Sequence, residues 1–200
     1  MSKVLFVNAC VRGEESRTLK LARAFLEVYA QRHPGDTIVE RNLMKERLEP
    51  LYPETLAQQH ALEQARQLDA PMFALAREFV EADKLILAAP FWELSFPAIM
   101  RIYLERVSVV NLTFGYCEDG EERGFCRGEK MLYLTTRGGD FSGDKADQDM
   151  GVRQLEGLCR NFGIGSFQCL AADGLDDQRF DPEAIMADAL ARVRALAETF

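Results

Sequence analysis

The chain has 200 residues, of which 48% are apolar and 28% charged, and its formal net charge is −8 at pH 7. This composition excludes a disordered, collagen-like or low-complexity chain, because enough apolar side chains are present to form a core. The length predicts one domain over residues 1–200, and the acidic balance argues against a nucleic-acid partner, which needs clustered Lys and Arg.

Short apolar runs alternate with segments of helical periodicity. The pattern predicts strands over 4–7, 84–89, 131–134 and 167–171, and a weaker strand over 37–40. Between the first strands it predicts a helix capped by Ser16 with apolar residues to position 29, a helix around 54–67 and a helix from Pro71 to about residue 82. Later in the chain it predicts a helix from Pro97 with apolar residues to Val110, a helix across 152–162 and a helix capped by Asp181. The continuous apolar runs are typical of strands buried on both faces of a parallel sheet.

Strands that alternate with helices indicate βαβ units, whose right-handed crossovers place helices on both faces of an open parallel sheet. Five strands in a chain of this length predict an α/β fold of the three-layer, flavodoxin-like order. In such a sheet a ligand lies beyond the carboxyl ends of the strands. Three loops should meet there, over residues 9–15, 90–96 and 137–147.

The first loop has neither the G-x-G-x-x-G pattern of dinucleotide-binding folds nor the P-loop pattern. It leads into a helix start with Ser16, Arg17 and Thr18. Two hydroxyls and a guanidinium beside the free N–H groups of a helix N-terminus suit a phosphate monoester. The alternative is an ordinary helix cap with Arg17 in solvent, and the loop alone favours it. Glu14 and Glu15 also argue against an anion unless they point away.

The second loop places Phe91, Trp92 and Phe96 directly after a buried strand, between two prolines. These rings would either flank a flat ligand or cover the end of the sheet or a subunit contact, and the loop alone does not decide. In the third loop, Gly138 and Gly139 either donate backbone N–H groups to a ligand or form a flexible turn. Together the three loops describe a phosphate pocket beside a slot for a flat ring, which is the shape of FMN.

Cysteine and histidine usage predicts neither disulfides nor a metal site. The five cysteines are an odd number without C-x-x-C spacing, and the two histidines, His33 and His60, lie far apart in polar stretches. The first apolar run is too short for a signal peptide, and no stretch approaches the roughly 20 apolar residues of a membrane span. We therefore expect a reduced, cytoplasmic protein with no membrane span.

Five segments carry a resemblance to a known family. They are Lys3-Val4-Leu5, Ser16-x-Thr18, Ala88-Ala89-Pro90 with the aromatics after it, Phe114-Gly115-Tyr116 and Thr135-Thr136-Arg137-Gly138-Gly139. On these segments the sequence resembles the FMN-dependent NAD(P)H oxidoreductases of the azoreductase and quinone reductase type over nearly the whole chain. The resemblance implies FMN as cofactor, NADH or NADPH as electron donor, and a flat aromatic acceptor such as a quinone or an azo dye. It also implies a homodimer in which residues 114–125 reach toward the partner's site.

The resemblance further implies which residues bind the cofactor. The start of the first helix would hold the phosphate, the aromatic loop would pack along the isoalloxazine, and the Gly-Gly loop would contact the ring's other edge. The predicted cofactor-binding set is Cys10, Ser16, Arg17, Thr18, Pro90, Phe91, Trp92, Glu93, Leu94, Thr136, Arg137, Gly138 and Gly139. No side chain is expected to act as a covalent catalyst, because the flavin carries the chemistry.

Three positions depart from the family pattern. Cys10 stands where the family often has serine, Glu93 where asparagine commonly follows the aromatic, and Phe141 where histidine or tyrosine is frequent. The Glu93 carboxylate would accept from the flavin N3–H but oppose an anionic reduced flavin. These departures keep two alternatives open: an FMN-binding electron carrier or regulator without turnover, and an interaction protein whose flavin site has decayed.

Overall fold

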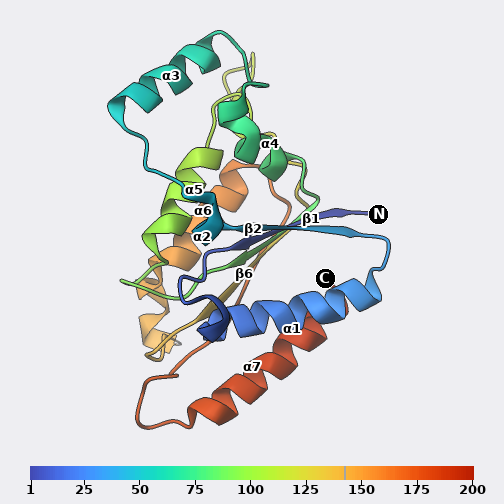
Figure 1. Ribbon diagram of the computed structural model, residues 1–200, viewed down its shortest axis with the longest axis vertical. Helices are drawn as coiled ribbons and strands as arrows, with labels where there is room; N and C mark the ends of the chain where they lie inside the picture. Colours follow the sequence, from blue (N-terminus) through green and yellow to red (C-terminus); the bar gives the residue numbers. More distant parts are fainter. Residues whose placement is uncertain (142) are drawn as a thin grey trace.

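A five-stranded parallel sheet forms the centre of the protein (Figure 1). The computed structural model describes residues 1–141 and 143–200. The strands are β1 (Lys3–Asn8), β2 (Thr37–Asn42), β3 (Lys84–Ala88), β6 (Lys130–Thr136) and β7 (Phe167–Ala172), in the order β2-β1-β3-β6-β7 across the sheet. This order confirms the predicted three-layer, flavodoxin-like fold, and each predicted strand is present with closely similar bounds.

The central strands form where continuous apolar runs are buried on both faces. Every residue of β3 is buried, whereas β2 at the edge of the sheet is only partly buried, as its weaker pattern predicts. In the strand pairing, Ala88 at the end of β3 lies opposite Asn8 of β1 and Leu134 of β6. The carboxyl ends of the three central strands therefore reach the same edge of the sheet.

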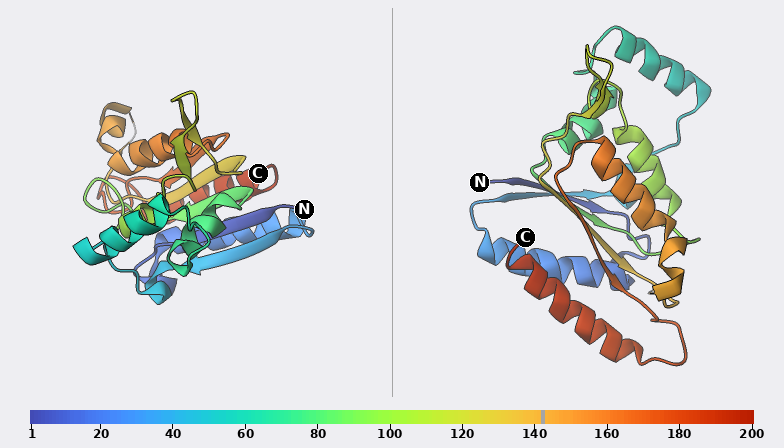
Figure 2. Two further views of the ribbon diagram at one scale, coloured as in Figure 1. Left: turned by 90° about the horizontal axis from the view of Figure 1, so that it is seen from above. Right: turned by 180° about the vertical axis from the view of Figure 1, so that it is seen from behind.

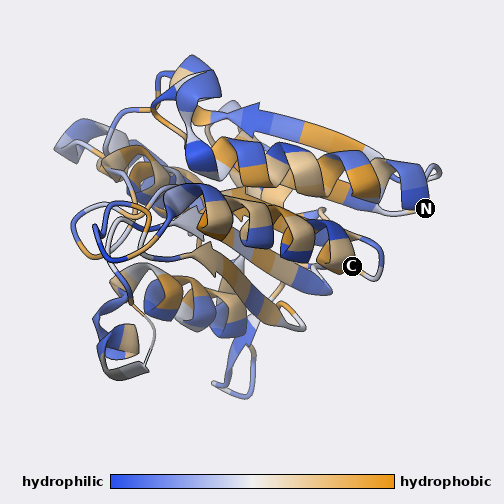
Figure 3. Cartoon of the chain, turned by 90° about the horizontal axis from the view of Figure 1, so that it is seen from below, coloured by the Kyte–Doolittle hydropathy of each residue, from blue (hydrophilic) through white to orange (hydrophobic). Residues whose placement is uncertain are grey.

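Helices cover both faces of the sheet (Figure 2). The helices are α1 (Arg17–Arg32), α2 (Leu43–Glu46), α3 (Pro53–Gln64), α4 (Ala74–Val80), α5 (Ala98–Val107), α6 (Met150–Asn161) and α7 (Pro182–Ala197). α1 and α7 lie side by side on one face, and α4, α5 and α6 pack on the other. Figure 3 shows apolar and polar residues alternating along α1 and α7, as expected for helices with one face on a sheet.

Local hydrogen bonds fix where the helices begin. The Ser16 hydroxyl oxygen accepts from the Leu19 N–H at 3.2 Å, and the Asp181 carboxylate accepts from the Glu183 N–H at 2.9 Å. Both predicted caps are therefore confirmed. These bonds satisfy backbone donors that a helix cannot satisfy within its first turn.

Two predicted helices are shorter than expected. The segment from Pro71 begins with a 3-10 turn (Pro71–Phe73), and α4 ends at Val80. α5 ends at Val107, so the prediction that Val110 shares its apolar face is wrong. The physical reason lies in the hydroxyl groups beyond the helix: Ser108 Oγ donates to the Leu104 carbonyl at 2.7 Å, and Thr113 Oγ1 accepts from the Val109 N–H at 2.9 Å.

An antiparallel hairpin of β4 (Phe114–Tyr116) and β5 (Glu122–Gly124) has no counterpart among the predicted elements. Its strands are very short and lack a continuous apolar run. The hairpin packs on the end of α6, where a Cβ at Gly124 would lie 1.8 Å from the carbonyl carbon of Phe162. The left view of Figure 2 shows it (olive) projecting from the body of the protein. Since α6 ends just before β7 begins, the hairpin lies toward the amino ends of the strands.

Three further properties follow from the part of the chain that the structure describes. No helix in it is long and apolar enough to cross a membrane. Its His, Cys, Asp and Glu side chains form no group of three that could hold a metal ion. The five cysteines are all free thiols.

Candidate functional site

The three predicted loops meet at the carboxyl ends of β1, β3 and β6. Hydrogen bonds continue past the strand ends: the Ala9 N–H donates to the Ala88 carbonyl at 2.8 Å, and the Phe91 N–H donates to the Thr136 carbonyl at 3.2 Å. These bonds satisfy the loop backbones and hold them side by side. Ser142 of the third loop lies outside the described residues.

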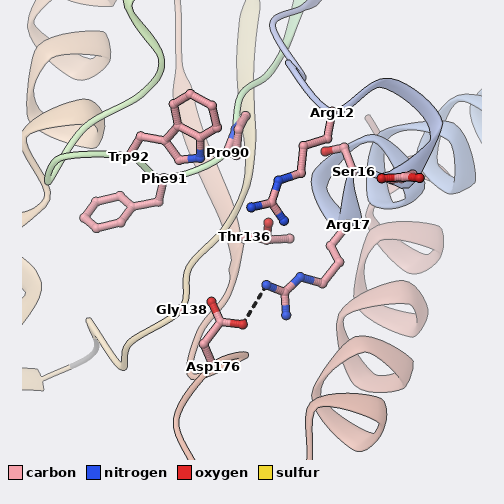
Figure 4. A pocket seen from close by; sticks show the side chains of 10 residues that line it. Arg12, Ser16, Arg17, Pro90, Phe91, Trp92, Thr136, Gly138 and Asp176 are labelled. Atoms are coloured by element: carbon pink, nitrogen blue, oxygen red, sulfur yellow. Dashed lines mark hydrogen bonds and ion pairs between the residues drawn. The ribbon is translucent and has the colours of Figure 1, made fainter.

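A cavity of about 300 Å³ lies between these loops and the start of α1 (Figure 4). It is lined by Arg12, Glu15, Ser16, Arg17, Pro90, Phe91, Trp92, Thr136, Gly138 and Asp176. Charged and hydroxyl groups gather at the α1 end, and the aromatic rings come from the second loop. The volume is within the range of small-molecule sites.

Ser16 and Thr18 take different places at the start of α1. Ser16 lines the cavity, its hydroxyl oxygen caps the helix, and its hydroxyl also lies within hydrogen-bonding reach of the Cys10 thiol. Thr18 is fully buried, and its Oγ1 lies 2.6 Å from Oγ1 of Thr136. Thr18 thus braces α1 against β6 and does not line the cavity.

The two arginines of the cavity differ in their partners (Figure 4). The Arg17 guanidinium forms an ion pair with Asp176 at 2.8 Å and donates to the Leu175 carbonyl at 3.2 Å. The Arg12 side chain makes no hydrogen bond or ion pair within residues 1–141 and 143–200. Its guanidinium points into the cavity.

Cys10 lies at the buried base of the first loop. Its side chain is buried, its Sγ donates to the Ala88 carbonyl at 3.6 Å, and its N–H donates to Asn8 Oδ1 at 3.0 Å. Burial raises the pKa of the Cys10 thiol to about 11, so the thiol is protonated at neutral pH. Cys10 supports the loop from below and does not line the cavity.

The second loop contains a tight turn from Trp92 to Ser95. The Trp92 N–H donates to the Ser95 carbonyl at 3.1 Å, and the Ser95 N–H donates back at 2.8 Å. Between them Glu93 and Leu94 have φ angles of 47° and 61°, the pattern of a type I′ turn, which favours Asn and Gly. Both side chains are exposed at the tip of the turn and do not line the cavity. An asparagine in place of Glu93 would therefore suit the backbone.

The aromatic side chains of this loop have two different roles. Phe96 is buried and meets the Tyr133 ring edge to face, with centroids 6.5 Å apart. Phe91 and Trp92 line the cavity, and Trp92 is 40% exposed. The two interpretations of the loop therefore apply to different rings: Phe96 covers the sheet, and Phe91 and Trp92 face the space where a ligand would lie.

Arg137 lies behind the cavity. Its buried guanidinium forms ion pairs with Asp149 and with Asp173, the latter at 2.8 Å. Asp149 also accepts from the Val152 N–H at the start of α6. The guanidinium lies 5.6 Å from the centroid of the Phe91 ring. The Arg137 side chain therefore supports Phe91 from behind and is not in a position to line the cavity, although the sequence places it in the cofactor-binding set.

The Gly-Gly loop is pinned by its carbonyl groups. The Gly138 carbonyl accepts from the Asp176 N–H at 2.9 Å, and the Gly139 carbonyl accepts from the Gly174 N–H at 3.0 Å. A Cβ at Gly138 would lie 2.6 Å from Asp176 Oδ2, so a larger residue there would displace the Asp176 carboxylate. The N–H groups of the two glycines have no acceptor among the residues described. The loop is therefore ordered, with donors left for a ligand.

The structure brings part of the predicted set to the cavity. Ser16, Arg17, Pro90, Phe91, Trp92, Thr136 and Gly138 line it, whereas Cys10, Thr18, Glu93, Leu94, Arg137 and Gly139 do not. Arg12, Glu15 and Asp176 line the cavity outside the predicted set, although Arg12 and Glu15 belong to the first of the three predicted loops. Asp176 follows β7. Because β7 is parallel to the other strands, the loop after it begins at the same edge of the sheet, and this rule could have identified Asp176 from the sequence.

These groups fit FMN at both ends of the cavity. The Ser16 hydroxyl, the Arg12 guanidinium and the start of α1 suit a phosphate. Phe91 and Trp92 suit a flat ring, and the N–H of Gly138 suits its polar edge. The fit is one of chemistry: hydrogen-bond donors, the free Arg12 guanidinium among them, gather at one end and aromatic surface at the other.

Comparisons with known proteins agree with this description. A family model described as the flavodoxin-like fold matches residues 2–197. The FMN-dependent NADH:quinone oxidoreductase 2 of Clostridium acetobutylicum is 36% identical over 202 residues. An FMN-dependent NADH:quinone oxidoreductase of Clostridium perfringens is 34% identical over 201 residues, and each match covers 100% of both chains.

Solved structures show the same relationship. The crystal structure of azoreductase from Bacillus anthracis has a TM-score of 0.89 and 29% identity, covering 100% of both chains. An FMN-dependent NADH-azoreductase from Bacillus anthracis, solved in complex with FMN, has a TM-score of 0.85 and 22% identity over 98% of each chain, which shows the shared fold. The chain therefore belongs to the flavodoxin-like family of FMN-dependent NADH:quinone oxidoreductases and azoreductases.

Proposed function

We propose that this chain binds FMN in the 300 Å³ cavity and reduces quinones and azo compounds with NADH. The observation that carries the proposal is the division of that cavity into a charged, hydroxyl-rich end and an aromatic end. The names of the relatives support the choice of quinone and azo acceptors and of NADH as donor.

At the phosphate end, the start of α1 provides backbone donors and the positive end of the helix dipole. The Ser16 hydroxyl lines this end while it caps α1, and Thr136 lines the adjacent wall, braced by Thr18. Because the brace is buried, the wall keeps its shape when a ligand enters or leaves.

At the ring end, Pro90 and Phe91 form a stiff wall that the Arg137 ion pairs support from behind. Trp92 is partly exposed and offers an indole face to a flat ligand. The N–H of Gly138 would donate to the polar edge of the ring. FMN, when bound, supplies the hydride-transfer chemistry, and the protein supplies binding and orientation. No cysteine, histidine or serine needs a covalent role.

We further propose that two copies of the chain form a homodimer. The β4–β5 hairpin, at the end of the protein away from its own cavity, carries Tyr116 at 68% exposure and is followed by Phe125 at 40%. A second hollow of about 400 Å³ between α3, α5 and α6 includes the apolar Leu56 and Val110. A two-fold dimer through this face would cover these side chains and bring the hairpin toward the partner's cavity. Sedimentation equilibrium at micromolar concentration should give twice the chain mass, and a monomer would refute this part.

We also propose a cytoplasmic location, since an odd number of free thiols suits a reducing compartment.

The experiment that tests the function is spectroscopic. The purified protein, after incubation with FMN and gel filtration, should show flavin absorption that anaerobic NADH bleaches and that menadione restores. Bleaching without multiple turnovers of menadione would indicate an electron carrier, and a colourless protein would refute the proposal. Trp92→Ala should change acceptor kinetics or the flavin spectrum, whereas Trp92→Phe, which keeps a flat ring, should change them less.

A further inference from the structure

We propose that Arg12 supplies the positive charge that binds the FMN phosphate, and that Arg17, held by Asp176, is a positioning residue that fixes the loop after β7. This inference rests on the proposed FMN site and decides between its two arginines. The sequence pattern favours Arg17 for the phosphate, because Arg17 stands between the two hydroxyl residues of the helix start. The contacts reverse that choice.

Arg17 is already held by acceptors on one loop. Its guanidinium contacts Asp176 Oδ1 at 2.8 Å and the Leu175 carbonyl at 3.2 Å. The N–H groups of the same two residues donate to the carbonyls of Arg137 at 3.1 Å and Gly138 at 2.9 Å. Arg17 therefore ties the start of α1 to the segment that pins the Gly-Gly loop. It acts on the ring end of the cavity through the backbone of that segment.

Arg12 has an ordered backbone and a free side chain. It precedes the 3-10 turn Gly13–Glu15, with φ −80° and ψ 2°, and its carbonyl accepts from the Glu15 N–H at 3.3 Å. Figure 4 shows its guanidinium directed into the space near Ser16 and Thr136. No acceptor for it exists in the part of the chain that the structure describes. Its donors are therefore available to a ligand without breaking an existing contact.

The charge balance of the cavity leads to the same choice. Its charged lining residues are Arg12 and Arg17 against Glu15 and Asp176, which gives a formal sum of zero. Arg17 and Asp176 neutralise each other in direct contact. A phosphate monoester carries a charge of about −1.5 to −2 at pH 7, so its attraction to this end depends on Arg12. Without Arg12, this end of the cavity would have a net negative charge and would repel the phosphate.

The test compares FMN with riboflavin, which has the same ring and no phosphate. Dissociation constants are measured by flavin fluorescence on the full chain. Arg12→Met should weaken FMN binding by about tenfold to a hundredfold, as expected for a lost charge-assisted hydrogen bond, and leave riboflavin unchanged. Arg17→Met should change the affinities for both flavins by a similar factor. Lys20→Met, which removes an exposed cation from the same end of α1, should change neither.

The variants also give the results that would overturn the inference. Thermal unfolding establishes that each variant is folded, and Arg12→Lys should restore part of the FMN affinity. The assignment is overturned if Arg12→Met binds FMN like the parent, or if Arg17→Met loses FMN affinity while keeping riboflavin affinity. A parent that binds both flavins equally would overturn the inference and leave a ring site in place. A parent that binds neither flavin would overturn the proposed function and this inference with it.

Discussion

Each end of the sheet buries one cation, and the surroundings of the two cations differ. At the amino ends of the strands, Lys84 donates to the Tyr29 hydroxyl at 2.9 Å and lies over the rings of Tyr29 and Phe200. At the carboxyl ends, Arg137 is paired with the carboxylates of Asp149 and Asp173. The first arrangement closes one end of the core with aromatic rings. The second supports loops around a cavity with polar contacts.

The difference indicates where the protein holds its ligand-binding surface. At the amino end Phe200 is buried and packs edge to face on Phe25, with centroids 5.4 Å apart. At the carboxyl end Trp92 is 40% exposed, and Glu93 and Leu94 hold left-handed backbone angles. Tyr116 of the hairpin is also exposed at the amino end, but at the carboxyl end the exposed aromatic lines the cavity and lies beside a strained turn, a combination typical of binding sites.

The largest expected effect separates the two buried cations. Arg137→Met should lower the free energy of unfolding by about 3–5 kcal/mol, because Asp149 and Asp173 lose their buried counter-ion. Lys84→Met should cost only about 1–2 kcal/mol, because its hydrogen-bond partner is the neutral Tyr29 hydroxyl. Urea unfolding at pH 7 measures both. Equal losses would contradict the comparison.

A second prediction concerns alkaline pH. The raised pKa of Cys10, about 11, means that the folded protein keeps a proton that the unfolded chain releases near pH 9. The free energy of unfolding should therefore fall as the pH rises from about 9 to 11, by up to about 3 kcal/mol from this thiol. Cys10→Ala should reduce this pH dependence in urea unfolding. An unchanged slope would show that the thiol is accessible in the folded state.

A third prediction concerns acid pH, where the free energy of unfolding should depend on Asp36 near the amino ends of the strands. The hydrogen bond that Asp36 accepts from the Tyr29 hydroxyl at 2.6 Å lowers the pKa of Asp36, and the bond from the Ser2 N–H adds to this. The resulting stabilisation is complete above the ordinary aspartate pKa of about 3.9 and is lost as the pH falls through the lowered folded value. Tyr29→Phe should make acid unfolding less steep in this range. The same steepness in both proteins would refute the assignment.

The smallest expected effect concerns the turn at the cavity. Glu93→Gly removes a side chain from a position with φ of 47° and should raise the free energy of unfolding by about 0.5–1 kcal/mol. Lys20→Gly, at an exposed position in α1, serves as the matched control and should destabilise by about 1 kcal/mol. Thermal unfolding shows whether each variant is more or less stable than the parent. Destabilisation by Glu93→Gly would contradict the prediction and show that the carboxylate has a structural partner.

The sequence predicts the sheet well because its strands are buried on both faces. Continuous runs such as β3 leave no other arrangement, and Ser16 marks the start of α1 through its own hydrogen bond. The hairpin β4–β5 has no such signal: its position depends on Gly124 packing against Phe162, a contact between residues distant in the sequence.

The site is predicted less completely, for a similar reason. Residue type and position in a loop identify Ser16 and Trp92, but they do not show which way a side chain turns. Thr18 and Arg137 turn toward partners on other strands and loops, Thr136 and Asp173 among them. Such partners follow from tertiary packing, and no local pattern specifies them.

The central claim is that the cavity at the carboxyl ends of the strands binds FMN, and Trp92 tests it most directly. It is the single tryptophan of the chain, and it lines that cavity. Titration with FMN should quench its fluorescence and saturate at one FMN per chain. Tryptophan emission that stays unchanged in excess FMN, beyond the inner-filter correction, would contradict the account.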